Sequence, residues 1–482
     1  MIVWGPFQPD RAGLNAKVVV EARNVLPGVS GLLPAPSLNP ATDALASQCR
    51  GAVSIIRDDG QVVSFAGTQE ALYKLSATST WNDVSRLVGG PYNVGAGELW
   101  KFDAFGSNVL ALNVVDGLQY IDASTGTNFA AVSGAPLARY IAVVRDFVVL
   151  GSIAGDEKRI QWCANNDITG WTPGVGESDY NDFPNGGPIR GLLGGEVGYI
   201  FQASKVTRMT YGAGSSTIFQ MDPLENASGL AAPHSLVELH SVAYYLASDG
   251  FRKLDKRGGA SEPIGHTKWL KWFLADIKPG TEISVVGAKN PVKPIIVWSY
   301  ISKQLGGSTP NRLLIYDWSL DEATYLDVST EALVSWLSPG ISLDQMNPYG
   351  TLDTLPFSLD SPFWKGGAAV FGAFGTDHKL SLQSGANLEA MIVTGDAAAD
   401  ARVLVKGTKP NVDAASVLVE ISGRERIADA VTWGSQEAME DTGTCPAHVS
   451  GNILRARVTI PAGQTWTNAQ GIKTDLARRG KR

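Results

Sequence analysis

A hairpin pattern that recurs along the chain limits the possible folds more than any other feature of this sequence. In the segment 196–211, the alternating apolar residues Val197, Tyr199 and Phe201 are followed by a polar corner and a second strand-like run that begins at Val206. This spacing is typical of two antiparallel strands joined by a tight turn. Similar pairs of strand-like runs occur at 61–75, 108–122, 146–162, 241–255 and 294–318.

The spacing of these hairpins predicts a propeller. Their second strands recur every roughly 42 to 46 residues, with one longer final step, and this period is that of propeller blades. A single hairpin is only marginally stable in water, so each unit must bury its apolar face against its neighbours. We therefore predict an all-β fold built on a β-propeller of about six blades; the alternatives are a β-sandwich and a chance run of hairpins.

Changes in composition divide the chain into four predicted parts. An apolar N-terminal arm (1–50) precedes the propeller (51–342), a connector rich in Pro, Asp and Gly (343–364) follows, and a second β-rich domain, here called the platform, covers 365–482. Because the arm is long and apolar, we expect it to dock on the platform or on a neighbouring subunit. Deleting the arm is then expected to abolish assembly and to leave the propeller folded.

One predicted helix interrupts the strands. In the segment 265–277, Trp269, Trp272, Phe273 and Ile277 recur at spacings of three and four residues, which is typical of a short amphipathic helix. This helix either packs on the flank of the propeller or binds a partner.

The charge balance argues against a protein that wraps nucleic acid. The chain has 47 acidic and 40 basic residues and a formal net charge of -7, whereas a DNA-binding protein ordinarily carries a basic stripe. The closing residues 476–482 are basic; they could contact nucleic acid or an acidic neighbour, or form a solvated tail.

The spacing of the cysteines and the composition of the N-terminus carry information about the cellular compartment of the protein. Cys49, Cys163 and Cys445 lie far apart without C-x-x-C spacing, which indicates reduced structural residues rather than a disulfide framework or a zinc site. The N-terminus lacks the charged and continuous apolar regions of a secretion signal, and no run approaches about 18 apolar residues. We therefore expect neither an export signal nor a membrane span.

Residue patterns that carry chemistry are weak in this chain. His234 and His240 are six residues apart on strand-like sequence and are expected to face the same side, but they form no metal-binding motif. The segment 166–171 is similar to the Asp-containing corner of sialidase propellers, in a single imperfect copy. The acidic pairs are expected to lie in turns, where they cap backbone amides rather than form a glycosidase site: Asp58 with Asp59, Glu177 with Asp182, and Asp321 with Glu322.

Motifs for nucleophilic catalysis and phosphate binding are also missing from the sequence. It contains no G-x-S-x-G elbow and no Walker A loop. We therefore predict no catalytic, cofactor-binding or metal-binding residues, and a protein that is not an enzyme.

Two segments carry a resemblance to a known family. They are W-x-x-x-x-D-x-x-x-W at 162–171 and I-F-Q-x-D-P-L-E-N-A-S-G at 218–229. Together with further stretches in the same order from Arg139 to the C-terminus, they resemble the tail hub or nozzle proteins of short-tailed phages, also called packaged-DNA stabilisation proteins. The pairs Cys163-Ala164 and Gly229-Leu230 depart from the residues expected at these positions.

The resemblance implies a propeller joined to a platform and assembled as a ring, usually a homohexamer, below the portal and its adaptor. It implies a structural virion protein of the phage tail that is made in the host cytoplasm. Its implied partners are further copies of itself, the head-to-tail adaptor protein and tail fibre or tail spike proteins. Double-stranded DNA would pass through the lumen of the ring without sequence-specific binding, and no catalytic residues come with the family.

Physical arguments agree with a conduit. Each phosphate held by Lys or Arg adds a salt-dependent attraction, so a channel that must release DNA should not be basic. A chain of this size cannot easily surround a duplex alone, and a cyclic oligomer is the natural way to build a channel.

Two other functions remain open at this stage. A propeller that degrades or binds glycans, as a tail component, predicts paired carboxylates and a pocket at the central pore. A monomeric scaffold that binds peptides predicts a single species of 51.1 kDa in solution. A channel ring instead predicts a dry pore and a large apolar arm.

Overall fold

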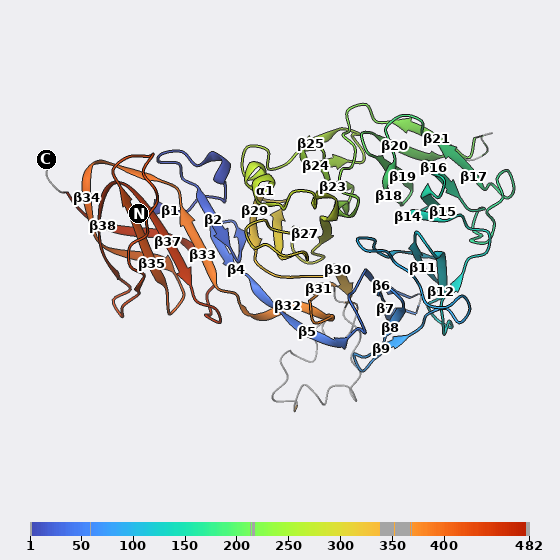
Figure 1. Cartoon of the computed structure of the whole chain (residues 1–482), viewed down its shortest axis with the longest axis horizontal. Coiled ribbons are helices and arrows are strands. Elements are labelled where there is room, and N and C mark those ends of the chain that lie inside the picture. The colour runs from blue at the N-terminus through green and yellow to red at the C-terminus, as the bar shows by residue number, and fades with distance from the viewer. Residues whose placement is uncertain are drawn as a thin grey trace.

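The structure is a computed structural model, and it describes residues 2–57, 59–212, 214, 217–337, 351, 367 and 369–478. Within these ranges the protein is almost entirely β, with a propeller at one end and the platform at the other (Figure 1). The helical segments that the structure describes are short: η1 (Pro9–Arg11), η2 (Pro233–Ser235), η3 (Glu282–Ser284) and α1 (Leu270–Asp276).

The predicted propeller of about six blades is confirmed, since the described residues form six separate four-stranded sheets arranged around a ring (Figure 1). Five of these sheets follow one another along the chain, each from its inner to its outer strand. They are β6 (Ala52–Ile56), β7 (Val62–Gly67), β8 (Leu72–Leu75) and β9 (Trp81–Asp83); β10 (Lys101–Phe105), β11 (Asn108–Asn113), β12 (Gly117–Asp122) and β13 (Ala130–Ala131); β14 (Ala138–Val144), β15 (Phe147–Ile153), β16 (Asp156–Trp162) and β17 (Asp179–Asp182); β18 (Ile189–Leu193), β19 (Val197–Gln202), β20 (Val206–Tyr211) and β21 (Phe219–Pro223); and β22 (Val237–Leu239), β23 (Val242–Ala247), β24 (Gly250–Asp255) and β25 (Ser261–Pro263).

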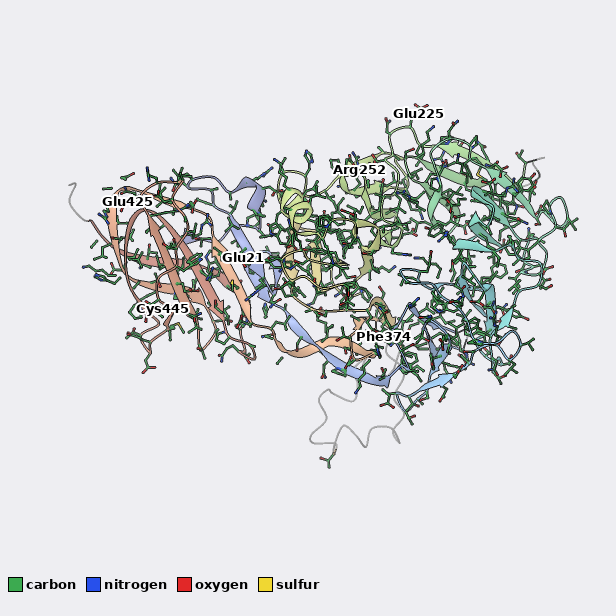
Figure 2. The ribbon with its side chains drawn as sticks, viewed as in Figure 1. Glu21, Glu225, Arg252, Phe374, Glu425 and Cys445 are labelled. Atoms are coloured by element: carbon green, nitrogen blue, oxygen red, sulfur yellow. The ribbon has the colours of Figure 1, made fainter. Side chains whose placement is uncertain are left out.

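The sixth separate sheet closes the ring with strands from both ends of the chain. It contains β30 (Ala332–Leu337), β31 (Ala369–Phe374), β32 (Lys379–Asn387) and, as its outer strand, β5 (Pro36–Ala44) from the N-terminal arm. Phe374, labelled in Figure 2, is fully buried in this blade. The inner strand β30 contacts β6, so the first and last blades meet. Pairing of an N-terminal strand with a late blade fixes the ring against opening.

One further four-stranded unit belongs to both the propeller and the platform. It consists of β26 (Val286–Lys289), β27 (Ile295–Tyr300), β28 (Arg312–Asp317) and β29 (Glu322–Leu326), and its inner strand β26 contacts β22 and β30. On its outer side, β29 pairs in parallel with β2 (Val19–Arg23), and β2 pairs with β33 (Ala390–Thr394). This unit is therefore continuous with the large sheet of the platform.

The platform combines strands from the two termini. Among the described residues its strands, besides β2 and β33, are β1 (Ile2–Val3), β3 (Val25–Gly28), β4 (Gly31–Pro34), β34 (Ala397–Val412), β35 (Leu418–Arg424), β36 (Glu437–Ala438), β37 (Cys445–Ile460) and β38 (Ala469–Arg478). β1 and β4 both pair with β38, so the N-terminal arm is built into this sheet. The arm therefore docks on its own chain.

Blades bury both of their faces because each has a neighbour on either side. All residues of β15, β27 and β28 are buried, which alternation on one face alone would not produce. In the hairpin of 196–211, Phe201 pairs with Val206 and both lie in the core shared with the following blade. Met209 lies in the core shared with the preceding blade, so the two strands of this hairpin do not present all their apolar residues to one side.

The structure corrects two expectations about domain organisation and does not test a third. The strands β31 and β32 lie within the segment assigned to the platform (365–482), but they form part of a propeller blade. Deletion of 1–50 cannot leave the propeller intact, because that segment supplies β5. The predicted connector, 343–364, lies outside the described residues apart from Thr351.

The predicted helix at 265–277 is confirmed, although it is shorter than expected. Its helical part is α1, and Phe273 and Trp269 pack with Phe251 in the core. The helix therefore packs on the flank of the propeller. Its first turn is capped from the N-terminal arm, because the carboxylate of Asp10 accepts hydrogen bonds from the backbone N–H groups of Lys271 (2.7 Å) and Trp272 (3.0 Å).

Replacing Asp10 with alanine is expected to lower the free energy of unfolding by about 1 kcal/mol, since two backbone donors of α1 lose their acceptor. Denaturant unfolding of the purified protein measures this change. Asp10→Asn keeps an acceptor oxygen and is the control, for which we expect a smaller loss. Unchanged stability of Asp10→Ala would show that the arm does not cap the helix in solution.

Candidate functional site: the axial cluster

The upper end of the propeller axis, where the inner strands begin, brings together polar residues from consecutive blades. Lys101 is the first residue of β10, Arg139 and Arg190 are the second residues of β14 and β18, and His234 lies in η2 just before β22. Glu98 lies in the segment that leads into β10. We call these five residues the axial cluster.

One hydrogen bond of this cluster crosses the axis. Lys101 Nζ lies 2.8 Å from His234 Nδ1. The strands that these residues precede or begin, β10 and β22, are not neighbours, because β14 and β18 stand between them in the ring. A contact between non-neighbouring inner strands must span the centre of the propeller. Side chains therefore bridge the axis at its upper end.

The two arginines are held by neighbouring groups. Arg139 Nη1 forms an ion pair with Glu98, and these side chains are 36% and 33% exposed. Arg190 Nη1 donates hydrogen bonds to the backbone carbonyls of Leu230 (3.2 Å) and Ala231 (3.0 Å). These contacts fix the guanidinium groups at the upper end while leaving part of the Arg139–Glu98 pair accessible to solvent.

A loop from the first blade completes this end of the axis. Arg50 Nη1 donates to the carbonyls of Val94 and Gly95, which anchors the loop 93–98 beside the inner strands. The backbone of Gly97 also interacts with His234. The loop and the Lys101–His234 contact together occupy the upper end of the axis.

The surrounding protein changes the protonation of the cluster. Burial lowers the pKa of Lys101 to about 8, although the charge of Glu98 acts in the opposite direction. Burial, and then the positive charge of Lys101, lower the pKa of His234 well below its usual 6.5, so its imidazole is neutral near pH 7. Neutral His234 can therefore accept the hydrogen bond that the Lys101 ammonium donates.

Replacing Lys101 with methionine is expected to reduce the pH dependence of stability. The lowered pKa means that the folded protein holds the Lys101 proton less tightly than the unfolded chain does, so this residue destabilises the folded protein below pH 8. Its contribution becomes more favourable as the pH rises from about 8 to 10. In buffer without added anions, we expect Lys101→Met to gain about 1 kcal/mol relative to wild type at pH 7 and to lose this gain by pH 10.

Denaturant unfolding of both proteins at pH 7 and pH 10 measures this difference. The result that contradicts it is a difference between the two proteins that stays the same at both pH values, because the Lys101 ammonium would then not be disfavoured by folding.

The two histidines singled out in the sequence do not face the same side. His234 lies in η2, before β22, whereas His240 follows the end of β22 in a backbone conformation with φ 54° and contacts the ring of Trp318. The prediction was wrong because the intervening β22 is only three residues long and is flanked by η2 and a tight turn. In the part of the chain that the structure describes, no group of three or more His, Cys, Asp or Glu side chains could hold a metal ion.

The Asp-containing corner at 166–171 has the turn geometry expected from sequence. Asp167 Oδ1 accepts hydrogen bonds from the backbone N–H (2.8 Å) and the hydroxyl (2.7 Å) of Thr169. Trp171 Nε1 donates to the carbonyl of Ile168 at 2.6 Å. The corner lies between β16 and β17, at the end of the propeller opposite to the axial cluster.

The acidic residues occupy turns or strand ends as expected, but the partners of Asp182, Glu177 and Asp321 are side chains rather than the backbone amides that we expected. Asp182 accepts two hydrogen bonds from Arg159 (2.5 and 2.7 Å), while Glu177 accepts one from Asn165 (2.9 Å). Asp321 pairs with Lys268 at 2.6 Å. These carboxylates do not belong to the axial cluster.

The remaining acidic pair is similar. Asp59 pairs with Arg57 at 2.6 Å in the turn between β6 and β7, and Asp58 lies outside the described residues.

The three cysteines are buried and free, as predicted.

Sequence reasoning missed the axial cluster because its members are far apart in the chain and form no local motif. A usable signal was present in the repeat. When the blades are aligned on their inner strands, Lys101, Arg139 and Arg190 place a basic residue at the first or second position of three successive blades. Equivalent positions in a propeller lie around the same end of the axis.

Comparisons with known proteins yield structural similarity alone. No protein-family model matches the chain, and no curated protein matches it. A crystal structure described as the extracellular domain of a hybrid two-component system, BT4673 from B. thetaiotaomicron, is similar with 9% identity and a TM-score of 0.44, over 78% of this chain and 43% of that chain. A second crystal structure, described as the extracellular domain of a one-component system BT4673, has 9% identity and a TM-score of 0.42, over 72% of this chain and 40% of that chain.

The chain spans less than half the length of these two solved structures, and neither similarity assigns it a function. No helix in the described ranges is long and apolar enough to cross a membrane.

Proposed function

We propose that this chain is a structural protein of a phage tail, a hub or nozzle that forms a homohexameric ring below the portal and its adaptor. The ring extends the DNA channel, retains packaged DNA and conducts it during ejection. The observation that carries the proposal is the resemblance of 162–171 and 218–229 to phage tail hub or nozzle proteins, together with a propeller joined to a platform.

In the two resembling segments, close contacts hold the strands and turns of a blade together. In the first, Trp162 Nε1 donates to the carbonyl of Glu177 at 2.8 Å, which ties β16 to the corner before β17. In the second, Gly229 lies so close to the backbone of Ser204 that a Cβ would be 2.4 Å from its nitrogen, and the next residue, Leu230, is fully buried. These contacts make the third and fourth blades rigid, which suits a subunit of a channel wall.

The N-terminal arm supports the proposal in a second way. It supplies β2 between the platform strand β33 and the blade strand β29, and it supplies β5 to the last blade. Propeller and platform are therefore joined by backbone pairing and not by a linker alone. A subunit of a channel under load requires such a rigid connection between its parts.

The axial cluster also affects where DNA would pass. Because Lys101 and His234 bridge the upper end of the axis, a duplex cannot run along the axis of a single propeller. In the proposed ring the channel is formed between several chains, as cyclic symmetry allows. The net charge of -7 suits a wall that releases DNA readily.

Electron microscopy of the purified protein, alone and with its adaptor partner, tests the proposal. We expect closed rings with an axial opening wide enough for duplex DNA. Isolated propeller-and-platform particles in both samples would overturn it.

A further inference from the structure

The axial cluster has more positive than negative charge within a confined space. At neutral pH, three members of the cluster carry a positive charge: Lys101, Arg139 and Arg190. His234 is neutral, and Glu98 supplies the negative charge that pairs with Arg139. These five residues thus have a net charge of about +2. Asp103, two residues after Lys101 on β10, is a further carboxyl group; burial raises its pKa, which favours its neutral form, and it accepts a hydrogen bond from the backbone N–H of Val143 at 2.9 Å. The charge of Glu157 also affects the pKa of Tyr140, but this effect is the smallest of those from the four charged groups near Tyr140. The side chain of Glu157 is exposed on β16.

The charges of the cluster act on shared neighbours at this end of the axis. The charges of Glu98, Arg139 and Arg190 all affect Tyr140, and Glu98 also affects Lys101. Lys101 in turn contacts His234 at 2.8 Å. Glu98 therefore links the two sets of groups, because its charge acts on both Tyr140 and Lys101.

Several donors of the cluster remain available for a ligand. The Lys101 ammonium has three N–H donors, and one of them serves His234 Nδ1. Arg190 uses Nη1 for two backbone carbonyls, although a guanidinium carries five N–H donors. Arg139 and Glu98 keep about a third of their side-chain surface exposed, so a small solute can reach this end of the axis.

We propose that the axial cluster binds a phosphate group, free or as a monoester, with Lys101 and Arg190 as the main donors and Arg139 beside them. A phosphate dianion matches the net charge of the cluster. Guanidinium groups suit its geometry because they offer parallel N–H donors to two oxygens, while an ammonium acts as a point charge. This site is independent of the proposed tail function and lies within a single chain.

The binding is expected to depend on the protonation of Lys101. Since the pKa of Lys101 is about 8, its ammonium is present at pH 7 and largely absent at pH 9. Arginine stays charged over this range, so it does not contribute to a change. Phosphate affinity should therefore fall when the pH rises from 7 to 9, opposite to the trend expected from the greater dianion fraction of phosphate itself.

Isothermal titration calorimetry of the full chain tests the site. The probes are inorganic phosphate and glycerol phosphate, each titrated at constant ionic strength set with sodium chloride in a buffer without other oxyanions. We expect saturable binding of phosphate to wild type and an affinity at least about tenfold weaker for Lys101→Met. The matched control is Lys205→Met, which removes an exposed lysine of the turn between β19 and β20 and should bind as wild type does.

Arg190→Met is the second variant, so that the test stands if Lys101→Met fails to fold. We expect it also to weaken binding by at least about tenfold. Binding of glycerol phosphate identifies the ligand as an ester, and binding of inorganic phosphate alone identifies it as the free ion. The proposal is overturned if neither probe binds wild type, or if a folded Lys101→Met or Arg190→Met protein binds as tightly as the Lys205→Met control.

Discussion

Replacing Arg312 with methionine is expected to lower the free energy of unfolding by about 3 to 5 kcal/mol, because the buried carboxylate of Asp276 and the half-buried carboxylate of Asp327 then lose this cation. Arg312 is 2% exposed. Its Nη1 lies 2.8 Å from Asp276 Oδ2 and its Nε lies 2.7 Å from Asp327 Oδ1. Its guanidinium also lies 4.7 Å from the ring centre of Tyr325.

Arg312 joins three parts of the molecule. Asp276 ends helix α1, Arg312 begins β28, and Asp327 follows β29 and lies 4.0 Å from Arg23 of the arm. Loss of the cation should therefore destabilise the contact between propeller and platform, as well as the unit of β26 to β29 that contains Arg312. Scanning calorimetry and denaturant unfolding measure the loss of stability.

The double variant Arg312→Met with Asp276→Asn is the control for this prediction. It removes one of the two stranded charges, so we expect it to recover part of the lost stability. A single Arg312→Met variant as stable as wild type would show that the ion pairs are not formed in solution.

Replacing Phe201 with aspartate is expected to unfold a blade, with a loss of several kcal/mol, because an unpaired charge enters an apolar layer. Phe201 is fully buried, and its ring lies 5.3 Å from that of Tyr245 in the next blade in an edge-to-face arrangement. Phe201→Leu keeps the site apolar and should cost far less. Folded Phe201→Asp protein with an unchanged melting temperature would contradict the packing between these blades.

Local signals in the sequence are sufficient to predict most of the propeller. Each of the first five blades is a run of consecutive strands, so the alternation within 196–211 and its relatives reveals them one by one. The platform strands at 390–394, 418–424 and 445–460 are likewise visible as alternating segments. These elements pair mainly with near neighbours or show their own periodicity.

The closure of the ring could not be predicted in the same way. Its strands come from 36–44, 332–337 and 369–387, so no local period connects them. The pairing of β2 with β29 is equally remote in sequence. Such partners are chosen by the three-dimensional arrangement of the ring, which a single sequence does not display.

The axial cluster could not be predicted for the same reason. Lys101 and His234 meet only because four consecutive blades curve around the axis and return β22 toward β10. Neither residue stands in a motif. By contrast, the corner at Asp167 is visible in the sequence as a similarity to an Asp-containing turn, because its partner Thr169 is two residues away.

The mass of the purified protein in solution, measured by light scattering with and without its adaptor partner, tests the central claim most directly. A ring predicts a species near six times the 51.1 kDa of one chain. A stable 51.1 kDa monomer under both conditions would contradict the proposed channel and favour a propeller that acts alone, on glycans or as a scaffold.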